Sequence, residues 1–554
     1  MAGNKTQINR PKPVVLVVLD GWGVTQPYSG NAISQANTPN FNDLVAHYPS
    51  MTLRASGEAV GLPWGEAGNS EVGHLNLGLG RIIYQDLPRI NKAISDNSFY
   101  KNEVFLKAID QAKANNSKLH FFGLVSSGNV HASIEHLYAL LALAKEKKVK
   151  EAYIHVILDG RDTPYNSGVN FIKDLNHYIA ECGIGKIATI SGRFYAMDRD
   201  NHWDRIAKAY SAMVAGEGNK GEDAIEVLEE SYKKKIYDEE FVPTVIREKG
   251  KPVATVENGD SLIFLNFRPD RARQITKAFV LPSFNKFKGW KYLDKLFFAG
   301  FVEYEKDLPM EIVFPQEVIA DTLGEIIAQA GLKQLRVAET EKYAHVTYFF
   351  NGGREAKSEG EEHELAPSLA VISYDLKPEM SALAITEKVI KAIDSDKYDF
   401  ILINFANADM VGHTGNLQAA IKAVEVVDSC LGKITKRVLD KNGAVLVTAD
   451  HGNAEMMFNM QTGMIDKEHT ANPVPFILVG RQFEGKTIGF KEIPGSDLSL
   501  VKPQGILSDV APTVLKIMGL PKPKEMTGRV YFKVIFSYRK KAPPFAKGGA
   551  HTNY

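Results

Sequence analysis

Short apolar runs rich in Val, Ile, Leu and Phe recur along this chain, and they constrain its fold more than any other feature. Runs of this kind are typical of parallel strands that are buried on both faces of a sheet. The clearest runs are Val14–Leu19, Val156–Leu158, Ile187–Ile190, Leu262–Phe267, Phe400–Phe405 and Ala444–Ala449. Helical patterns lie between them, and in the clearest one a single face carries Leu417, Ile421, Val424, Leu431, Ile434 and Val438. Strands that alternate with helices predict an α/β fold with mainly parallel sheets.

The residues that follow the predicted strands fall into two chemical groups. In open α/β sheets, ligands bind beyond the carboxyl ends of the strands, so these positions are candidates for function. In the outer parts of the chain they hold carboxylates and imidazoles, namely Asp20, Asp409, His413, Asp450 and His451. In the middle of the chain they hold arginines, namely Arg161, Arg193, Arg268 and Arg271. We interpret the outer parts as a metal-binding region and the middle part as an anion-binding region.

This order predicts one domain inserted into another, since 554 residues exceed one ordinary core. We expect residues 1–84 and 318–530 to form a discontinuous metal-binding domain, and residues 85–317 to form an inserted substrate domain. The chain is expected to cross between them near Gly80–Asp86 and Glu305–Phe314.

The charge balance and the cysteine content disfavour several classes of partner. With 66 basic and 66 acidic residues, neither nucleic acid nor an anionic membrane is favoured. Cys182 and Cys430 are too few for a disulfide framework or a thiolate metal site, which favours a reducing cytoplasm. The run Val14–Leu19 is too short to span a membrane. The segment 531–554, which is basic and has no acidic residue, is interpreted as a flexible tail of no assigned role.

The outer parts of the chain contain enough ligands for two metal ions. Asp409 and His413 are four residues apart, so that one helical turn would place them on the same side. His469 precedes a polar turn, and Asp20 and the pair Asp450-His451 end predicted strands. Each of these residues alone is better explained as structural. Together their oxygen and nitrogen atoms suit Mn, Mg or Zn.

Ser70 is the candidate nucleophile of this region. It lies in Gly68-Asn69-Ser70-Glu71-Val72-Gly73-His74, where glycines on both sides permit a close approach of the backbone. A serine hydroxyl is a weak nucleophile at neutral pH, and metal coordination would lower its pKa. The alternative is a serine that merely caps a helix, as in most Gly-Asn-Ser sequences.

Five motifs, taken together, resemble one known family. They are Asp20-Gly-Trp-Gly, Gly68-Asn-Ser-Glu-Val-Gly-His, Asp159-Gly-Arg-Asp-Thr-Pro, Asn266-Phe-Arg-Pro-Asp-Arg and Asp450-His-Gly-Asn. With these motifs the chain, from Val14 to Gly528, resembles the cofactor-independent phosphoglycerate mutases of the alkaline phosphatase superfamily. The resemblance implies an alkaline-phosphatase-like metal domain interrupted by a substrate domain. It also implies an isomerase of glycolysis and gluconeogenesis that needs no 2,3-bisphosphoglycerate.

The resemblance further implies a role for each site residue. One metal ion would be held by Asp409, His413 and His469, and the other by Asp20, Ser70, Asp450 and His451. Manganese is the expected metal, with magnesium or cobalt as alternatives. Ser70 would take the phosphoryl group from 3-phosphoglycerate and return it to the 2-hydroxyl, with Asp162 as general acid/base and Lys342 beside the alkoxide. Substrate contacts map onto His131, Arg161, Asp162, Arg193, Arg199, Arg268, Arg271 and Lys342. A monomer that binds phosphoglycerate is expected.

Two positions depart from the family pattern, and two other functions stay open. The segment Ser127-Gly-Asn-Val-His-Ala132 replaces the usual Asp-Gly-Gly-Val-His-Ser, and Tyr165 replaces a second proline. A metal-dependent phosphomonoesterase of the same superfamily is one alternative, although it would need fewer arginines for the departing alcohol. A non-catalytic metal- or phosphate-binding protein is the other, and the presence of Ser70 among the ligands disfavours it.

Overall fold

A computed structural model describes residues 10–317, 319–459, 462–488, 497–531 and 535–536. The described residues form two compact units. The discontinuous unit comprises the described parts of Met1–Tyr84 and Val318–Tyr554, and the continuous unit comprises Gln85–Glu317. Each unit has its own hydrophobic core around its own sheet. No helix among the described residues is long and apolar enough to cross a membrane.

The sheet of the discontinuous unit is mainly parallel. Its strands, in spatial order, are β13 (Glu361–Ala366), β12 (Gln334–Glu339), β14 (Phe400–Phe405), β1 (Val14–Leu19), β15 (Ala444–Thr448), β16 (Val474–Val479), β2 (Ser50–Arg54) and β18 (Gly505–Ile506). The first five run parallel, β16 is antiparallel to both of its neighbours, and β18 is parallel to β2. Every residue of β1 is buried because helices cover both faces.

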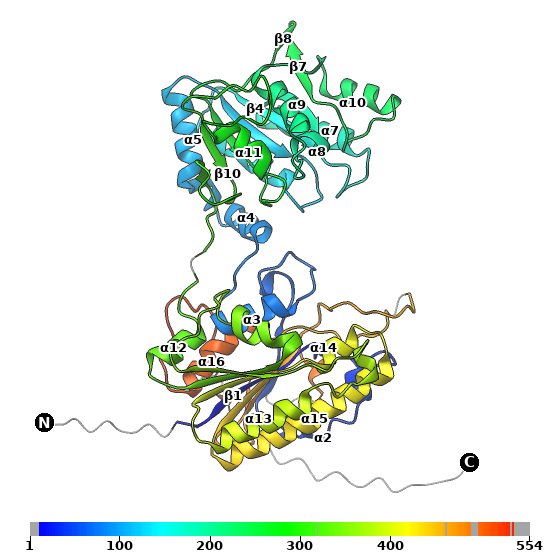
Figure 1. Ribbon diagram of the computed structural model, residues 1–554, viewed down its shortest axis with the longest axis vertical. Coiled ribbons are helices and arrows are strands. Elements are labelled where there is room, and N and C mark those ends of the chain that lie inside the picture. The colour runs from blue at the N-terminus through cyan, green and yellow to red at the C-terminus, as the bar shows by residue number, and fades with distance from the viewer. Residues whose placement is uncertain (1–9, 318, 460–461, 489–496, 532–534, 537–554) are drawn as a thin grey trace, which may run out of the picture. The chain divides into compact units, whose positions relative to one another are not determined.

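The helices of this unit are α1 (Ala32–Gln35), α2 (Pro39–His47), α3 (Ser70–Leu79), α12 (Leu323–Gln329), α13 (Ala382–Asp394), α14 (Asn407–Gly412), α15 (Leu417–Asp440) and α16 (Val510–Ile517). Figure 1 shows α3, α12 and α16 on one face of the sheet, and α2, α13 and α15 on the other. The predicted amphipathic helix is confirmed as α15, which buries the six apolar positions Leu417 to Val438 wholly or in part against the core.

The continuous unit contains a second, mainly parallel sheet. Its strands, in spatial order, are β11 (Glu311–Ile312), β10 (Phe297–Gly300), β9 (Ser261–Phe264), β3 (Leu119–Leu124), β4 (Ala152–Leu158), β5 (Lys186–Gly192), β7 (Thr244–Glu248) and β6 (Asn219–Gly221), with β8 (Lys251–Pro252) paired to β7. From β11 to β5 all neighbours are parallel, and β7 is antiparallel to β5.

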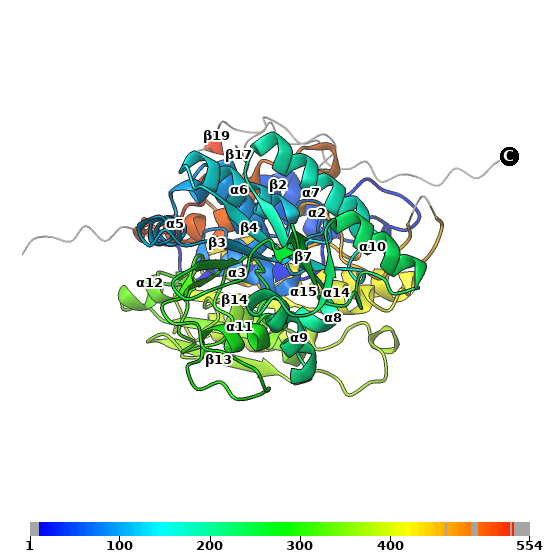
Figure 2. The ribbon, with the colours of Figure 1, turned by 90° about the horizontal axis from the view of Figure 1, so that it is seen from above.

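The helices of the continuous unit are α4 (Asp86–Ser95), α5 (Glu103–Ala114), α6 (Ile134–Glu146), α7 (Gly168–Cys182), α8 (Arg193–Ala196), α9 (Trp203–Val214), α10 (Ala224–Lys233) and α11 (Arg273–Val280). In Figure 2, α6 and α7 lie on one side of the strands of this sheet, and α9 and α11 lie on the other. The two mainly parallel sheets confirm the predicted α/β class.

Several strand bounds differ from the sequence predictions. The run Leu262–Phe267 was predicted as one strand, but β9 ends at Phe264. Beyond that point Tyr304 Oη lies within hydrogen-bond distance of the carbonyl oxygens of Phe264 and Asn266, at 3.0 and 2.6 Å, and its single O–H is shared between them. Most of the predicted tail at 531–554 lies outside the described residues; Ile535–Phe536 forms β19, antiparallel to β17 (Thr487–Ile488).

Candidate active site

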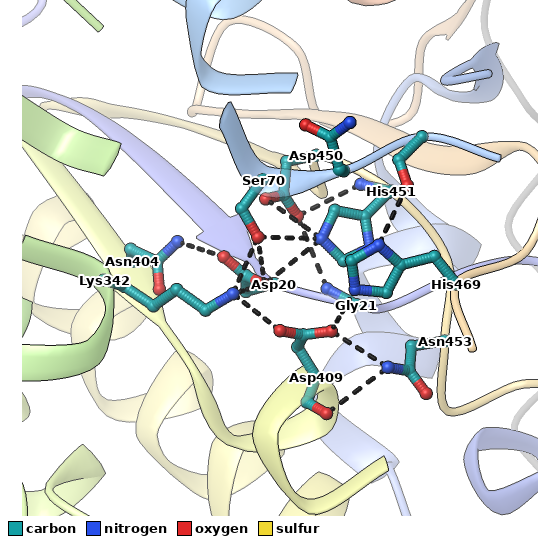
Figure 3. Close-up of polar contacts among 12 residues, drawn as sticks. Asp20, Gly21, Ser70, Lys342, Asn404, Asp409, Asp450, His451, Asn453 and His469 are labelled. Carbon is teal, nitrogen blue, oxygen red and sulfur yellow. Dashed lines mark hydrogen bonds and ion pairs between the residues drawn. The ribbon is translucent and has the colours of Figure 1, made fainter. Parts of the chain in front are cut away.

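The predicted metal ligands of the discontinuous unit meet at the carboxyl ends of adjacent parallel strands. The register pairs Leu19 of β1 with Phe405 of β14, and Val18 of β1 with Thr448 of β15. Asp20 and Asp450, each two residues beyond the Val18–Thr448 pair, therefore reach the same edge of the sheet. Asp409 reaches that edge from α14, and Figure 3 shows these carboxylates around Ser70.

Ser70 is the first residue of α3, and Asn69 is the N-cap of this helix. Ser70 is buried, with 6% of its surface exposed. The Asn69 side chain accepts a hydrogen bond from the backbone of Val72 at 2.9 Å, so the helix start is fixed. The Ser70 hydroxyl lies 2.9 Å from His451 Nε2 and 3.4 Å from Asp20 Oδ1. The nucleophile candidate is thus held among the predicted metal ligands, at a helix N-terminus that favours anions.

Lys342 also reaches this place, from the short helical turn after β12. Its Nζ donates to Ser70 Oγ at 2.7 Å and forms ion pairs with Asp20 Oδ1 at 2.7 Å and Asp409 Oδ2 at 2.6 Å. A lone Glu-Lys-Tyr sequence would ordinarily lie on a solvated surface, but Lys342 is buried. Although burial alone would lower the pKa of Lys342, Asp20 and Asp409 raise it, so the ammonium stays charged.

Asp409, His413 and His469 form one group of converging atoms. His413 Nδ1 faces the Lys467 carbonyl at 2.7 Å, and His469 Nδ1 faces the Gly68 carbonyl at 2.9 Å. Because a carbonyl only accepts, each Nδ1 carries a proton, and each Nε2 faces Asp409. The two Nε2 atoms are 3.0 Å apart and lie 3.2 and 3.1 Å from Asp409 Oδ1. Three lone-pair atoms around one point are the arrangement that a bound cation requires.

Asp20, Asp450 and His451 form the neighbouring group, and all three are buried. His451 Nε2 lies 3.5 Å from Asp20 Oδ1 and 3.6 Å from Asp450 Oδ2. His451 also belongs to a second cluster, with Asp409 and His469. The two groups of candidate ligands are therefore neighbours, with His451 between them.

The charges of this site favour the binding of cations. Asp20, Asp409 and Asp450 are buried carboxylates, and Lys342 supplies one ammonium among them. Burial and the nearby Asp450 carboxylate raise the pKa of Asp20 well above its usual value. Buried charges are tolerated when they are paired or coordinate metals. Carboxylate oxygens and imidazole nitrogens in this arrangement fit hard or borderline divalent cations.

Gly21 permits the close approach of two of these loops. Its φ is +74°, and a Cβ atom at this position would lie 2.7 Å from the Asp409 Cα. Any other residue would push Asp20 and Asp409 apart, which explains the glycine after the first predicted ligand.

The predicted arginines gather in the continuous unit, at the carboxyl ends of β9, β3, β4 and β5. The register pairs Leu158 of β4 with Gly192 of β5, so Asp159 and Arg193 follow side by side. Arg193 Nη1 donates to Asp159 Oδ1 and to Asp162 Oδ2, both at 2.6 Å. This bridge fixes the predicted acid/base Asp162 next to a guanidinium.

A second carboxylate, Asp270, holds three more of the predicted substrate residues. Its oxygens lie 2.9 Å from Arg199 Nη1, 3.1 Å from Arg268 Nε and 3.7 Å from His131 Nδ1. Arg271 instead donates to the Met197 carbonyl at 3.2 Å. His131 is buried although its loop departs from the family pattern, with Asn129 at a φ of +57°.

Positive charge dominates this arginine cluster. Burial, together with Arg193, Arg199 and Arg161, lowers the pKa of Arg271. Burial and Arg193 also lower the pKa of His131 to about 4, so its imidazole is neutral near pH 7. Tyr165, the other departure from the family pattern, is exposed and packs edge-on against Tyr237. A cluster of this kind suits a small anion with several oxygens.

Sequence reasoning missed the groups that orient these side chains. Asn404 Nδ2 donates to Asp20 Oδ2 at 2.7 Å and lies 3.0 Å from His74 Nε2. Asn453 Nδ2 donates to Asp409 Oδ1 at 2.9 Å. His74 lies four residues after Ser70 in the quoted motif, and Asn453 ends the Asp-His-Gly-Asn segment, so their positions in these motifs were the available signal.

Comparison with known families assigns one family description to each unit. The description BPG-independent PGAM N-terminus matches residues 90–306, within the continuous unit. The description Type I phosphodiesterase / nucleotide pyrophosphatase matches residues 323–480, within the discontinuous unit.

Full-length relatives extend this likeness. The 2,3-bisphosphoglycerate-independent phosphoglycerate mutase of Clostridium perfringens is 52% identical over 518 residues, which cover 93% of this chain and 98% of the relative. That of Clostridium kluyveri is 52% identical over 525 residues, covering 94% and 99%. A crystal structure of Leishmania mexicana phosphoglycerate mutase at low cobalt concentration has 31% identity and a TM-score of 0.50, covering 96% of this chain and 98% of that one.

Fold and comparisons together define a protein in which a phosphodiesterase-type unit is interrupted by a mutase-specific unit. The chain belongs to the 2,3-bisphosphoglycerate-independent phosphoglycerate mutase family. The predicted resemblance is thereby confirmed.

Proposed function

We propose that this protein interconverts 3-phosphoglycerate and 2-phosphoglycerate through a phosphoserine on Ser70, without 2,3-bisphosphoglycerate. The observation that carries this proposal is the position of the Ser70 hydroxyl. It lies 2.7 Å from Lys342 Nζ and 2.9 Å from His451 Nε2, at the N-terminus of α3. The family name of the relatives supports the same reaction.

Two divalent ions are proposed for the carboxylate and imidazole groups. Asp409, His413 and His469 would hold one ion. Asp20, Ser70, Asp450 and His451 would hold the other. When bound, such ions lower the pKa of the serine hydroxyl and neutralise charge on phosphoryl oxygens. Manganese is our preferred metal, with magnesium or cobalt as alternatives, because the donor set contains both carboxylates and imidazoles.

Ser70 and Lys342 carry the first half of the reaction. The Ser70 oxygen forms a bond to phosphorus while the bond from phosphorus to the 3-oxygen of glycerate breaks. Ser70 would attack as the alkoxide, its proton having been released to solvent before the cycle begins. Lys342 donates a hydrogen bond to Ser70 Oγ and so stabilises this alkoxide, which attacks in the first half and leaves in the second. Ser70 is also the first residue of α3, and a helix N-terminus favours phosphoryl oxygens.

The arginine cluster of the continuous unit is proposed to hold glycerate during the second half. Arginine side chains bind carboxylate and phosphate oxygens in pairs, which suits Arg161, Arg193, Arg199, Arg268 and Arg271. Asp162 would give a proton to the 3-oxygen and take one from the 2-hydroxyl, which then attacks the phosphoserine. His131 and Lys342 complete the proposed substrate contacts. After one cycle Asp162 is protonated again, Ser70 is free again, and the phosphoryl group has moved from the 3-oxygen to the 2-oxygen of glycerate.

The proposed activity has a direct test. Purified protein is assayed with 3-phosphoglycerate in the absence of bisphosphoglycerate, before and after chelation and after addition of Mn²⁺. We expect 2-phosphoglycerate as the main product, loss of activity on chelation and its return with the metal. Release of inorganic phosphate as the main product would instead identify a phosphomonoesterase. We further propose that the enzyme acts as a monomer in the cytoplasm.

A further inference from the structure

Glu455 is a buried carboxylate that joins three loops of the discontinuous unit. Its Oε2 accepts from the backbone N–H groups of Gly23 at 3.1 Å and Asn453 at 2.8 Å. Its Oε1 accepts from Thr470 Oγ1 and from Asn472 Nδ2 at 3.0 Å. Each oxygen therefore receives two donors, and the whole side chain is buried.

The same three loops carry the proposed metal ligands. Gly23 follows Asp20, Asn453 follows Asp450 and His451, and Thr470 follows His469. Backbone bonds support the junction, since the Asn453 and Ala454 N–H groups donate to the Gly21 carbonyl at 3.0 and 3.1 Å. The Thr470 N–H also donates to the Gly452 carbonyl at 3.0 Å. Glu455 lies where these loops meet.

Two glycines make room for this carboxylate. A Cβ atom at Gly23 would lie 2.2 Å from Glu455 Cδ, and one at Gly452 would lie 2.4 Å from Glu455 Oε1. A carboxylate is costly to bury, and hydrogen bonds from four donors offset that cost. Only glycine at positions 23 and 452 leaves space for the Glu455 side chain.

We propose that Glu455 is a positioning residue that sets the metal affinity of the site by holding Asp20, His451 and His469 in ligating positions. This inference rests on the proposed metal ions. Groups that hold metal ligands in place without contacting the ion contribute about 10–100-fold to the affinity for the metal, because misplaced ligands must be reordered when the ion binds. Glu455 acts on all three loops at once.

Glu455→Gln is the sharpest test because it changes the shape of the side chain very little. Glutamine replaces one acceptor oxygen by an amino group, which would face two donors in either orientation. We expect Mn²⁺ binding to weaken about 10–100-fold, measured by the electron paramagnetic resonance signal of free Mn²⁺. Raised Mn²⁺ should restore kcat, and KM for 3-phosphoglycerate at saturating Mn²⁺ should be unchanged.

Asp428→Asn is a matched control. Asp428 on α15 is also buried and accepts from the Phe41 and Asn40 backbones at 2.7 and 3.2 Å and from Asn40 Nδ2 at 2.8 Å. It joins α15 to α2 rather than the metal loops. This variant should lower Tm while its Mn²⁺ affinity stays that of the parent protein.

Three outcomes separate the possibilities. If Glu455→Gln lowers Tm as Asp428→Asn does but binds Mn²⁺ within twofold of the parent, the positioning role is wrong. If Glu455→Gln does not fold, Thr470→Val decides: losing one donor should weaken Mn²⁺ binding about two- to tenfold, and unchanged affinity overturns the inference. A parent protein that binds no Mn²⁺ would instead overturn the proposed metal ions themselves.

Discussion

The two units place their functional residues at the same kind of sheet edge, yet with opposite charge and different exposure. In the discontinuous unit, Asp20 and Asp450 are fully buried and tied to fixed partners. In the continuous unit, the side chains of Arg161, Arg199 and Arg268 are 53%, 47% and 50% exposed. This difference accords with the proposed roles, a buried site for resident metal ions and an exposed cluster for an anion that exchanges with solvent.

Because of this difference, we expect substitutions in the two units to have different kinetic effects. Changes among the buried carboxylates and imidazoles should remove the chemical step itself, because the proposed function places those groups around the transferred phosphoryl group. Changes among the exposed arginines should mainly weaken substrate use and leave the metal in place.

Ser70→Ala should have the largest effect of all. A methyl group accepts no phosphoryl group, so we expect kcat to fall by at least about 10⁴-fold while the far-ultraviolet circular dichroism is unchanged. Ser395→Ala, at the C-terminal end of α13 in the same unit, is the control and should keep full activity. Activity near that of the parent protein in Ser70→Ala would remove the phosphoserine mechanism.

Asp409→Asn and His451→Ala should each resemble chelation. Each removes a charged or imidazole ligand from a buried site, so bound Mn²⁺ should decrease and kcat should fall more than about 100-fold. Metal content by atomic absorption, measured beside kcat, checks this. Either variant with full metal content and full activity would contradict its assignment as a ligand.

Arg268→Ala should separate the two units most clearly. We expect KM for 3-phosphoglycerate to rise about 10–100-fold through the loss of charge-assisted hydrogen bonds, with Mn²⁺ content unchanged. Arg10→Ala provides an arginine control, since Arg10 pairs with Asp399 on the discontinuous unit, and it should leave KM as it was. Loss of metal from Arg268→Ala would contradict the assignment of metal binding to one unit and substrate binding to the other.

Arg161→Ala should give the smallest but most specific effect. Weaker binding lets glycerate dissociate before its 2-hydroxyl attacks the phosphoserine. Water then accepts the phosphoryl group more often. In oxygen-18 water the parent enzyme should yield unlabelled 2-phosphoglycerate and almost no free phosphate. The variant should yield a larger share of labelled free phosphate, measured by mass spectrometry. An unchanged share would show that Arg161 does not retain glycerate.

The sequence predicted where most of the candidate site residues lie, because those residues follow buried strands. Val14–Leu19 and Phe400–Phe405 are strands with the bounds that their apolar runs indicate, and Asp20 and Asp409 lie beyond their ends. Lys342 was harder, since its neighbours are polar and only the packing of β12 beside β14 brings it inside. The local pattern alone indicated a surface lysine.

Two of the orienting groups, Glu455 and Asp270, could not be predicted from local pattern. Glu455 acts through contacts with Gly23 and Thr470, which are far away in the sequence. Asp270 likewise reads as one more charge in Arg-Pro-Asp-Arg, although it pairs with Arg199, which lies between α8 and α9. Such residues are defined by tertiary contacts, and short motifs contain no information about those contacts.

Rapid trapping of the phosphorylated enzyme tests the central claim most directly. The parent protein with Mn²⁺ is mixed with 3-phosphoglycerate that carries a ³²P label, quenched in acid during turnover and digested. We predict label on the peptide that contains Ser70, and none on that peptide from Ser70→Ala. Label on a different residue, or product formation at the full rate with no labelled peptide, would contradict a phosphoserine at Ser70.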